Sequence, residues 1–291
     1  MLLPVYRVNY AHSDTAPPVA APIVYNGEDR RWIFSSRWLI STQPYHAAAG
    51  RILSTVFPDD CRVCGQPLRE FSRIPVCSIC LRTPEPLEAE FFCAACRTPF
   101  LNRFPLDDHG LCTLCRLGLS GFDAAYTYGA YDGPLRRLIH LFKYEGVEPL
   151  AAPLGDWMLR AFPRQERFDA VAPMPLHWLR RWRRGFNQAE LLARHIAGST
   201  GIPILHAVRR RRPTAPQAGL TNAGRRANVA GAFQPRSGVK SLRILLVDDV
   251  ITTGATAGAC AAALKRAGAA RVCVLTVARA DRRMPDLAGV S

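Results

Sequence analysis

The segment Arg243-Ile-Leu-Leu-Val-Asp-Asp-Val-Ile-Thr-Thr-Gly-Ala-Thr256 indicates the fold of this 291-residue chain. It begins with a short apolar run, Ile244 to Val247, which is typical of a strand buried on both faces of a parallel sheet. Two adjacent carboxylates, Asp248 and Asp249, come where this strand should end. Carboxylates accept hydrogen bonds from hydroxyl groups, so the pair suits the vicinal diol of a ribose.

The residues after the carboxylates predict a turn into a helix. Thr252-Thr253-Gly254-Ala255-Thr256 should begin an alanine-rich helix that runs to about Lys265, with Gly268 just beyond its end. Backbone N–H groups at a helix N-terminus point outward, and the helix dipole adds roughly half a positive charge there. The threonine hydroxyls add further donors, so the turn predicts a phosphate site. A 5-phosphorylated ribose offers both the phosphate and the diol.

This segment resembles the PRPP-binding motif of type I phosphoribosyltransferases, where PRPP is 5-phosphoribosyl 1-pyrophosphate. The acidic pair, the threonines and the glycine all fall at the spacing of that motif. The alternative is a buried strand that ends in two solvated acids. Two other phosphate-handling folds fit less well, because haloacid dehalogenase-like phosphatases separate their acids as Asp-x-Asp and receiver domains lack the Thr-Thr-Gly turn.

The composition limits the classes of protein to which the chain can belong. Its formal net charge of +15 favours anionic partners, either phosphorylated small molecules or nucleic acid. No apolar run approaches the roughly 18 residues of a membrane span. The start, Met1-Leu-Leu-Pro4, lacks the basic and apolar regions of a secretory signal. We therefore expect a soluble cytoplasmic protein.

Eight of the ten cysteines form four Cys-x-x-Cys pairs, a pattern that indicates metal binding in a cytosolic chain. Twelve residues separate the first two pairs and fifteen separate the last two, which is the spacing of zinc ribbons. We predict two structural Zn²⁺ ions, because this segment has too few large apolar residues to fold without them. The predicted ligands are Cys61, Cys64, Cys77, Cys80, Cys93, Cys96, Cys112 and Cys115.

Other readings of the cysteines stay open. The pairs can instead form a redox relay or hold an iron–sulfur cluster. Joining the first pair to the second and the third to the fourth is the simplest arrangement, but an interleaved one is also compatible with the spacing. Cys260 and Cys273 stand alone and should be core residues.

A second basic segment precedes another predicted helix. Asn187 should cap that helix, and Glu190 should complete a capping box. Arginines beside a helix N-terminus form a second anion site, and a solvated basic face is the alternative. The four arginines are Arg180, Arg181, Arg183 and Arg184.

This basic segment, Pro173-Met-Pro-Leu to Arg184-Gly-Phe-Asn-Gln188, and the four cysteine pairs ahead of it resemble the ComF (competence protein F) family. The resemblance covers roughly residues 55 to 280. It implies an α/β fold, namely a type I phosphoribosyltransferase-like parallel sheet flanked by helices and preceded by a small double zinc-ribbon module. It also implies that the basic loop from Arg209 to Phe233 is the mobile hood over the catalytic site.

We accordingly divide the chain into four parts. Residues 1–45 should be a poorly ordered N-terminal extension, and residues 46–118 a short helix and the double zinc ribbon. Residues 119–281 should form the phosphoribosyltransferase-like domain, and residues 282–291 a tail.

The motif and the resemblance assign the site residues. Asp248 and Asp249 are the catalytic carboxylates and bind the ribose hydroxyls, and the turn from Thr252 to Thr256 binds the 5′-phosphate. Mg²⁺ would bridge the pyrophosphate and the ribose, while no residue indicates the acceptor base. The residues expected at the pyrophosphate and in the hood are Arg183, Arg184, Asn187, Gln188, Gln217, Arg225 and Asn228.

Three hypotheses for function follow. The first is a phosphoribosyltransferase that takes PRPP or ribose 5-phosphate and, as the family resemblance implies, acts in DNA uptake with other DNA-uptake proteins as partners. The second is a single-stranded-DNA-binding protein, because arginines alternate with Trp178, Trp182 and Phe186. The third is a regulator that binds PRPP without turnover.

Overall fold

The computed structural model describes residues 23–24, 33–34, 60–68, 72–100, 103, 106–176, 185–211 and 231–280. The chain divides into two compact units, residues 1–49 and 50–291. In the first unit, the described residues form one antiparallel pair, β1 (Ile23–Val24) and β2 (Ile33–Phe34). The helix predicted from His46 to Phe57 lies outside the described residues.

Four parallel strands form the central sheet of the second unit, in the order β5, β10, β9, β6. Their bounds are Ala124–Ala130 for β5, Ala170–Pro173 for β6, Arg243–Ile251 for β9 and Arg271–Arg279 for β10. Leu245 in β9 pairs with Cys273 on one side and with Val171 on the other. The apolar run in β9 is fully buried, as the sequence predicts for a central parallel strand.

Strand β9 is longer than the prediction. Its pairing with β10 continues to Ile251, opposite Arg279. Asp248 and Asp249 were predicted where the strand should end, but they lie within it, because the strand continues to Ile251. The cause is a non-local partner, because β10 supplies backbone hydrogen bonds beyond the apolar run.

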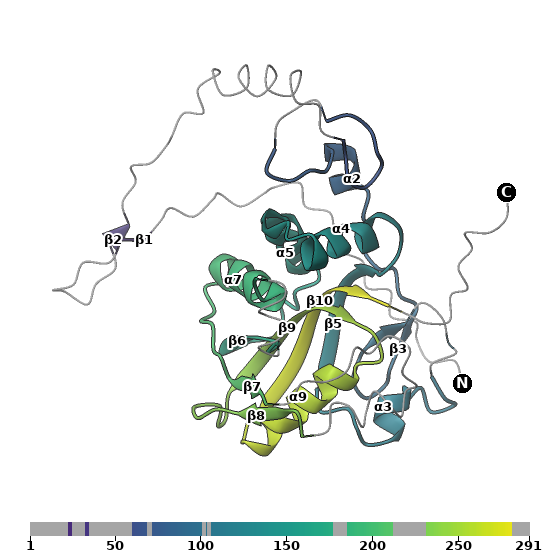
Figure 1. The fold of residues 1–291 in the computed structure, drawn as a ribbon. Helices are drawn as coiled ribbons and strands as arrows, with labels where there is room; N and C mark the ends of the chain where they lie inside the picture. Colours follow the sequence, from purple (N-terminus) through teal and green to yellow (C-terminus); the bar gives the residue numbers. More distant parts are fainter. Residues whose placement is uncertain are drawn as a thin grey trace. The chain divides into compact units, whose positions relative to one another are not determined.

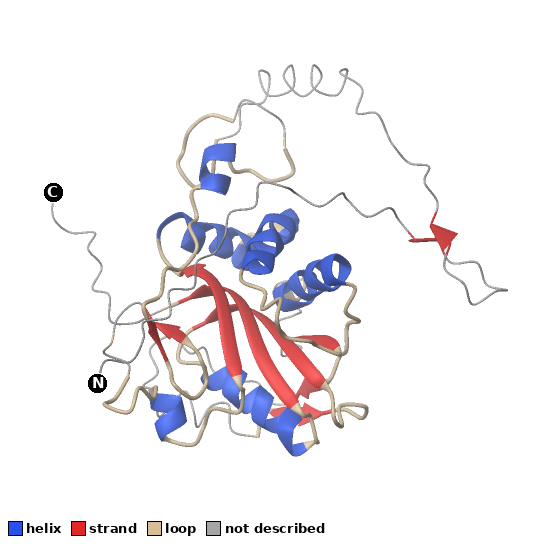
Figure 2. Ribbon diagram, turned by 180° about the vertical axis from the view of Figure 1, so that it is seen from behind, coloured by secondary structure: helices blue, strands red, loops and turns tan. Residues whose placement is uncertain are grey.

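Helices cover both faces of the sheet (Figure 1). One face carries α4 (Gly133–Tyr144), α5 (Ala151–Arg160) and α7 (Gln188–Thr200), and the other carries α9 (Ala255–Arg266). Alternate side chains of β9 divide between these faces, since Leu245 packs with the first group of helices and Leu246 with α9. The view from behind shows the same two layers of helices (Figure 2).

The helix ends follow from local sequence. Asp132 precedes α4, Pro134 lies in its first turn, and its apolar stripe is buried against the sheet. Gly254 precedes α9 with φ of 78°, and Gly268 follows that helix with φ of 95°. Both values lie in the left-handed region that glycine adopts readily. Between α4 and α5 lies a short 3-10 helix, Glu148–Leu150.

Two short strands form a hairpin on the α9 side of the sheet. β7 (Val208–Arg210) pairs with β8 (Phe233–Pro235) in antiparallel fashion. The N–H of Arg211 donates to the carbonyl of Ala232 at 2.9 Å. The two ends of the predicted hood are therefore adjacent, and its central residues, 212–230, lie outside the described residues.

The cysteine segments form two small ribbons. The first ribbon (Cys61–Cys80, with residues 69–71 not described) contains the start of α2 (Ser78–Arg82), and its Val63 and Val76 join the core on the α4 face. The second ribbon (Cys93–Cys115) contains β4 (Pro99–Phe100), which pairs with β3 (Phe91–Phe92), and α3 (Thr113–Arg116). Its core residues join the α9 face. The two ribbons therefore extend the cores on opposite faces of one sheet.

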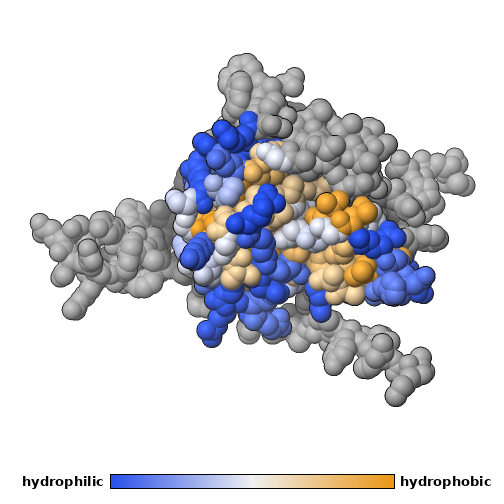
Figure 3. Space-filling model, turned by 90° about the horizontal axis from the view of Figure 1, so that it is seen from below, coloured by the Kyte–Doolittle hydropathy of each residue, from blue (hydrophilic) through white to orange (hydrophobic). Residues whose placement is uncertain are grey.

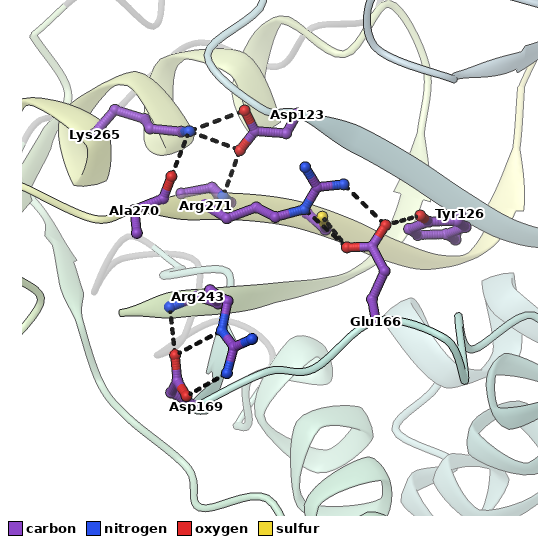
Figure 4. Close-up of polar contacts among 10 residues, drawn as sticks. Asp123, Tyr126, Glu166, Asp169, Arg243, Lys265, Ala270 and Arg271 are labelled. Carbon is purple, nitrogen blue, oxygen red and sulfur yellow. Dashed lines mark hydrogen bonds and ion pairs between the residues drawn. The ribbon is translucent and has the colours of Figure 1, made fainter. Parts of the chain in front are cut away.

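Ion pairs lie at the amino ends of strands β9 and β10 (Figure 4). Arg243, at the start of β9, binds Asp169 at 3.0 Å, and Arg271, at the start of β10, binds Glu166 at 2.8 Å. Hydrogen bonds from Arg271 hold the pKa of Glu166 below its usual range. These charges satisfy one another at the amino ends of the strands, whereas ligands of open α/β sheets bind at the opposite, carboxyl ends.

Candidate functional site

The carboxyl ends of the parallel strands bring the predicted motifs to one edge of the sheet. The acidic pair lies at the end of β9, the turn from Thr252 follows it, and Met174 follows the end of β6. Asn187, before α7, donates from its side-chain amide to the Met174 carbonyl at 3.3 Å. Ligands of open α/β sheets bind at this edge, so the topology supports the placement that the motif predicts.

The two carboxylates point to opposite faces of the sheet, because they are consecutive residues of a strand. Asp249 faces the α4 side, where its carboxylate forms an ion pair with the ammonium of Lys143 at 2.8 Å. Both side chains are nearly buried, with exposed fractions of 14% for Lys143 and 12% for Asp249. Asp248 faces the α9 side and accepts a hydrogen bond from the Asp249 N–H at 2.9 Å.

The surroundings perturb the charge of Asp248 and Lys143. Burial raises the pKa of Asp248 to about 7, with a further contribution from the neighbouring charge of Asp249, while Lys143 and Arg210 act in the opposite direction. Burial by itself would lower the pKa of Lys143, but the carboxylates of Asp249 and Asp248 outweigh the effect of burial, so the pKa of Lys143 is raised. The site therefore places a cation beside two carboxylates, and the pKa of one of them, Asp248, lies above that of a free carboxyl group.

Lys143 is not among the site residues that the sequence predicts. A signal for it exists in the sequence. It follows Ile139 by four residues and so lies on the buried face of α4, where a cation requires a partner. The carbonyl of Lys143 also accepts a hydrogen bond from the side chain of Gln188 at 3.4 Å. Lys143 thus links the acidic pair to the start of α7.

The turn after β9 leads directly into a helix N-terminus. The hydroxyl of Thr253 accepts a hydrogen bond from the Ala255 N–H at 3.4 Å, and α9 begins at Ala255. The side chains of Thr252, Thr253 and Thr256 are partly exposed, while Gly254 and Ala255 are buried. Hydroxyl groups and the N-terminus of a twelve-residue helix therefore meet at the edge of the sheet.

The second predicted segment is described only in part. Asn187 precedes α7 as predicted, but the capping box is wrong. The Asn187 amide bonds Met174 instead, and the Glu190 carboxylate pairs with Arg194 at 3.0 Å and with His206 at 3.5 Å. Tertiary partners here outcompete the local cap. The other residues predicted for this site, Arg183, Arg184, Gln217, Arg225 and Asn228, lie outside the described residues.

The cysteines gather in two separate clusters of four, which resolves the pairing left open by the sequence. The clusters are Cys61, Cys64, Cys77, Cys80 and Cys93, Cys96, Cys112, Cys115, and in each the sulfur atoms lie within 4.8 Å of one another. The simplest pairing was correct. Cys260 and Cys273 are buried in the core, also as predicted.

Both clusters have the dimensions of a zinc site. The sulfur atoms of Cys64 and Cys77 are 3.8 Å apart, and those of Cys96 and Cys112 are 3.7 Å apart. Four sulfurs that bind Zn²⁺ tetrahedrally at about 2.3 Å lie about 3.8 Å from one another. A disulfide would require about 2.05 Å. In both clusters a backbone N–H donates to sulfur, from Cys77 to Cys61 and from Cys112 to Cys93, each at 3.3 Å. The residues fit structural Zn²⁺.

Comparison with known proteins gives relatives along most of the chain. Residues 182–291 match the phosphoribosyl transferase domain family. The DNA utilization protein YhgH of Salmonella typhimurium is 31% identical over 230 residues, which cover 76% of this chain and 97% of that protein. Competence protein F of Haemophilus influenzae is 34% identical over 179 residues, which cover 58% of this chain and 78% of that protein.

Among solved structures, the allosteric regulatory enzyme of purine biosynthesis matches with a TM-score of 0.33 and 23% identity, covering 45% of this chain and 26% of that one. This likeness is too limited to carry an argument. The sequence relatives are stronger evidence, because the chain spans nearly the whole length of the Salmonella protein. Together with the phosphoribosyl transferase domain and the paired cysteine clusters, they show that this chain belongs to the ComF (competence protein F) family.

Proposed function

We propose that this protein binds PRPP, or ribose 5-phosphate, together with Mg²⁺ at the carboxyl edge of its sheet, and that it is a phosphoribosyltransferase. The observation that carries the proposal is the position of the acidic pair among the last residues of β9, a strand that ends at Ile251 and is followed by the N-terminus of α9 at Ala255. Hydroxyl-binding and phosphate-binding groups then lie a few residues apart, as a phosphorylated ribose requires.

In this proposal each part of the site has one task. Asp248 and Asp249 bind the ribose hydroxyls, and the residues from Thr252 to Thr256 bind the 5′-phosphate. The segment that leads into α7 binds pyrophosphate through Arg183, Arg184, Asn187 and Gln188. The hood, with Gln217, Arg225 and Asn228, covers the ligand and excludes water, because an activated ribose otherwise hydrolyses.

Electrostatics explain how these groups assist transfer. Loss of pyrophosphate from the anomeric carbon leaves positive charge on the ribose ring and negative charge on the leaving group. Carboxylates beside the ring and arginines at the leaving group stabilise both charges. Mg²⁺ held with the ligand at this edge of the sheet would neutralise part of the pyrophosphate charge.

Lys143 has a further part in this arrangement. PRPP is strongly anionic, and two adjacent carboxylates, of which Asp249 is buried, would repel it. The ammonium of Lys143, 2.8 Å from Asp249, neutralises one of them and keeps it in place. The net charge that the ligand meets at the acidic pair is thereby reduced.

Mass spectrometry decides between a transferase and a sensor. Purified protein is incubated with Mg²⁺ and PRPP, and with each of several nucleobases or ammonia in turn. We expect PRPP loss and equimolar pyrophosphate only with a suitable acceptor. Binding of PRPP without consumption by any acceptor would contradict turnover and favour a regulator that senses PRPP.

We also propose that the two cysteine clusters each hold one Zn²⁺ ion. The support is the sulfur geometry, which matches tetrahedral zinc, and the position of the clusters in ribbons with small cores. Elemental analysis of protein purified without added metal should give about two zinc atoms per chain. Iron with visible absorbance, or almost no metal, would contradict the assignment.

A second candidate function, which does not exclude the first, is binding of single-stranded DNA during DNA uptake, in the cytoplasm and with other uptake proteins. The relatives are named for DNA utilization and competence, and the chain carries a net charge of +15. On the face that contains α9, hydrophilic residues surround apolar patches (Figure 3). Exposed basic residues near the β7–β8 hairpin and α9 are Arg209, Arg211, Arg236, Lys240 and Arg266.

Fluorescence anisotropy with a labelled oligonucleotide tests this candidate. We expect affinity to fall with salt by a slope of about −0.7 per phosphate contacted. Substitution of Trp178 or Trp182 by alanine should cost roughly 1–3 kcal/mol if these side chains stack on bases. Competition by PRPP would place DNA at the carboxyl edge of the sheet. Failure to bind even at about 50 mM salt would contradict DNA binding.

A further inference from the structure

The second ribbon lies directly against the turn to which we assign the phosphate. Leu114, in α3 between the cluster residues Cys112 and Cys115, is 6% exposed and belongs to the same core as Ile251 and Ala255. A Cβ atom placed on Gly254 would lie 2.8 Å from Cδ1 of Leu114. The Leu114 side chain therefore packs on the backbone of the turn itself.

The chain that leaves the ribbon continues this contact along α9. A Cβ atom on Gly258 would lie 2.8 Å from the carbonyl oxygen of Leu119, and one on Gly121 would lie 2.3 Å from the N atom of Ala262. Backbone thus approaches backbone at two successive turns of the helix. Any larger residue at Gly121 or Gly258 would push the end of the ribbon away from α9.

The ribbon also contacts the sheet in two places, at the end of β10 beside the turn and near the start of β5. The guanidinium of Arg279, at the end of β10, lies 4.1 Å from the ring centroid of Phe100. The N–H of Ala125 in β5 donates to the carbonyl of Cys96 at 3.2 Å. The second ribbon therefore contacts both the sheet and the turn. Loss of order in the ribbon can for this reason reduce the order of the turn.

From these contacts we propose that Leu114 is a positioning residue for the phosphate-binding turn and that metal in the second cysteine cluster holds Leu114 in place. The proposal rests on the function proposed above. Helix α3 has only four residues, so it has almost no stability of its own. Two members of the second cysteine cluster flank Leu114, since Cys112 precedes the helix and Cys115 is its third residue, so a metal bound there would fix the position of α3.

The first ribbon provides the contrast. Its Val63 and Val76 belong to the core on the α4 face, and the guanidinium of Arg137 donates to the carbonyl of Val63. The three atoms nearest to a Cβ placed on Gly254 of the turn belong to Leu114 of the second ribbon, to Phe122 in the chain that follows it, and to Ile251. Loss of metal from the first cluster should therefore affect the turn much less than loss from the second.

The test compares two leucines of the full-length protein, Leu114→Ala and Leu117→Ala. Leu117 lies three positions later and is 50% exposed, so it controls for the change of residue type. Hydrogen exchange of the ligand-free protein measures the order of the amides from residue 252 to 258. We expect at least tenfold faster exchange there in Leu114→Ala, wild-type exchange in Leu117→Ala, two zinc atoms in both, and recovery in Leu114→Met.

Calorimetry with Mg²⁺ and PRPP gives the functional readout. We expect Leu114→Ala to weaken binding at least tenfold and Leu117→Ala to leave it unchanged. Cys112→Ser should lose one zinc atom and show the same faster exchange of the turn as Leu114→Ala. Cys61→Ser should also lose one zinc atom, but exchange of the turn should stay as in wild type.

Equal exchange of the turn in Leu114→Ala and Leu117→Ala overturns the inference, whether or not PRPP binds. Faster exchange in Leu114→Ala with wild-type PRPP affinity also overturns it, because the turn then needs no such support. Absence of PRPP binding by the wild-type protein refutes the proposed function instead, and the exchange contrast still decides whether Leu114 orders the turn.

Discussion

Replacement of Lys143 by methionine is expected to lower the free energy of unfolding by about 3 kcal/mol. Methionine preserves the packing of the aliphatic chain but leaves the Asp249 carboxylate, which is 12% exposed, without its cation. A buried charge that loses its partner carries its full desolvation cost. Urea unfolding of both proteins at neutral pH measures the difference.

Lys265 supplies the matched control. It binds Asp123 at 2.7 Å, a distance close to that of the Lys143 pair, but the two side chains are 30% and 31% exposed. Solvent screens such a pair, so Lys265→Met should cost less than about 1 kcal/mol. The double variant Lys143→Met/Asp249→Asn should regain most of the loss. If Lys143→Met costs no more than Lys265→Met, the buried ion pair has no special role.

Asp248→Asn is expected to make the ligand-free protein more stable than wild type, by an amount that increases with pH. Burial and the charge of Asp249 raise the pKa of Asp248 from 3.8 to about 7. Between these two pH values the folded state holds a proton on Asp248 that the unfolded state releases. The contribution of Asp248 to the free energy of unfolding of wild type is therefore lost as pH rises from about 4 through 7. Asparagine does not titrate, so its advantage should reach roughly 1–3 kcal/mol at pH 8.

Urea unfolding at pH 5 and pH 8 measures that advantage. Asp169 is the control of opposite sign, because hydrogen bonds from Arg243 hold its pKa below the usual range. Asp169→Asn should lose stability relative to wild type at pH 8. If the stability of Asp248→Asn relative to wild type does not increase between pH 5 and pH 8, the pKa of Asp248 is not raised in the folded state. A stabilising change that abolishes ligand binding is the usual sign of a functional site.

Local patterns in the sequence predicted the parts of the fold that depend on near neighbours. The apolar run in β9 and the glycine after α9 each correspond to an element in the structure. Strand β9 extends past its apolar run because β10 pairs with it, and no local signal predicts that partner. The same reason explains the missing cap of α7, since Asn187 binds Met174 of a distant segment.

The candidate site also combines parts that the local sequence predicts with parts that depend on distant segments of the chain. Its acidic pair and turn form one continuous motif, so the sequence located them together. The Lys143–Asp249 pair joins α4 to β9, and the contact of Leu114 with Gly254 joins a ribbon to a turn. Both arise from the topology of the sheet and its two layers. A lysine on a buried helix face is a detectable signal for the first contact, whereas the second has none in the sequence.

The central claim is that the segment from Asp248 to Thr256 binds PRPP, and calorimetric titration with PRPP in the presence of Mg²⁺ tests it most directly. The proteins to compare are wild type and the double variant Asp248→Asn/Asp249→Asn, which keeps the shape of both side chains and removes their charge. We expect wild type to bind one ligand per chain and the double variant to bind at least about 100-fold more weakly, a difference of about 2.8 kcal/mol. Equal affinity in the two proteins, or no binding by wild type, would contradict the claim.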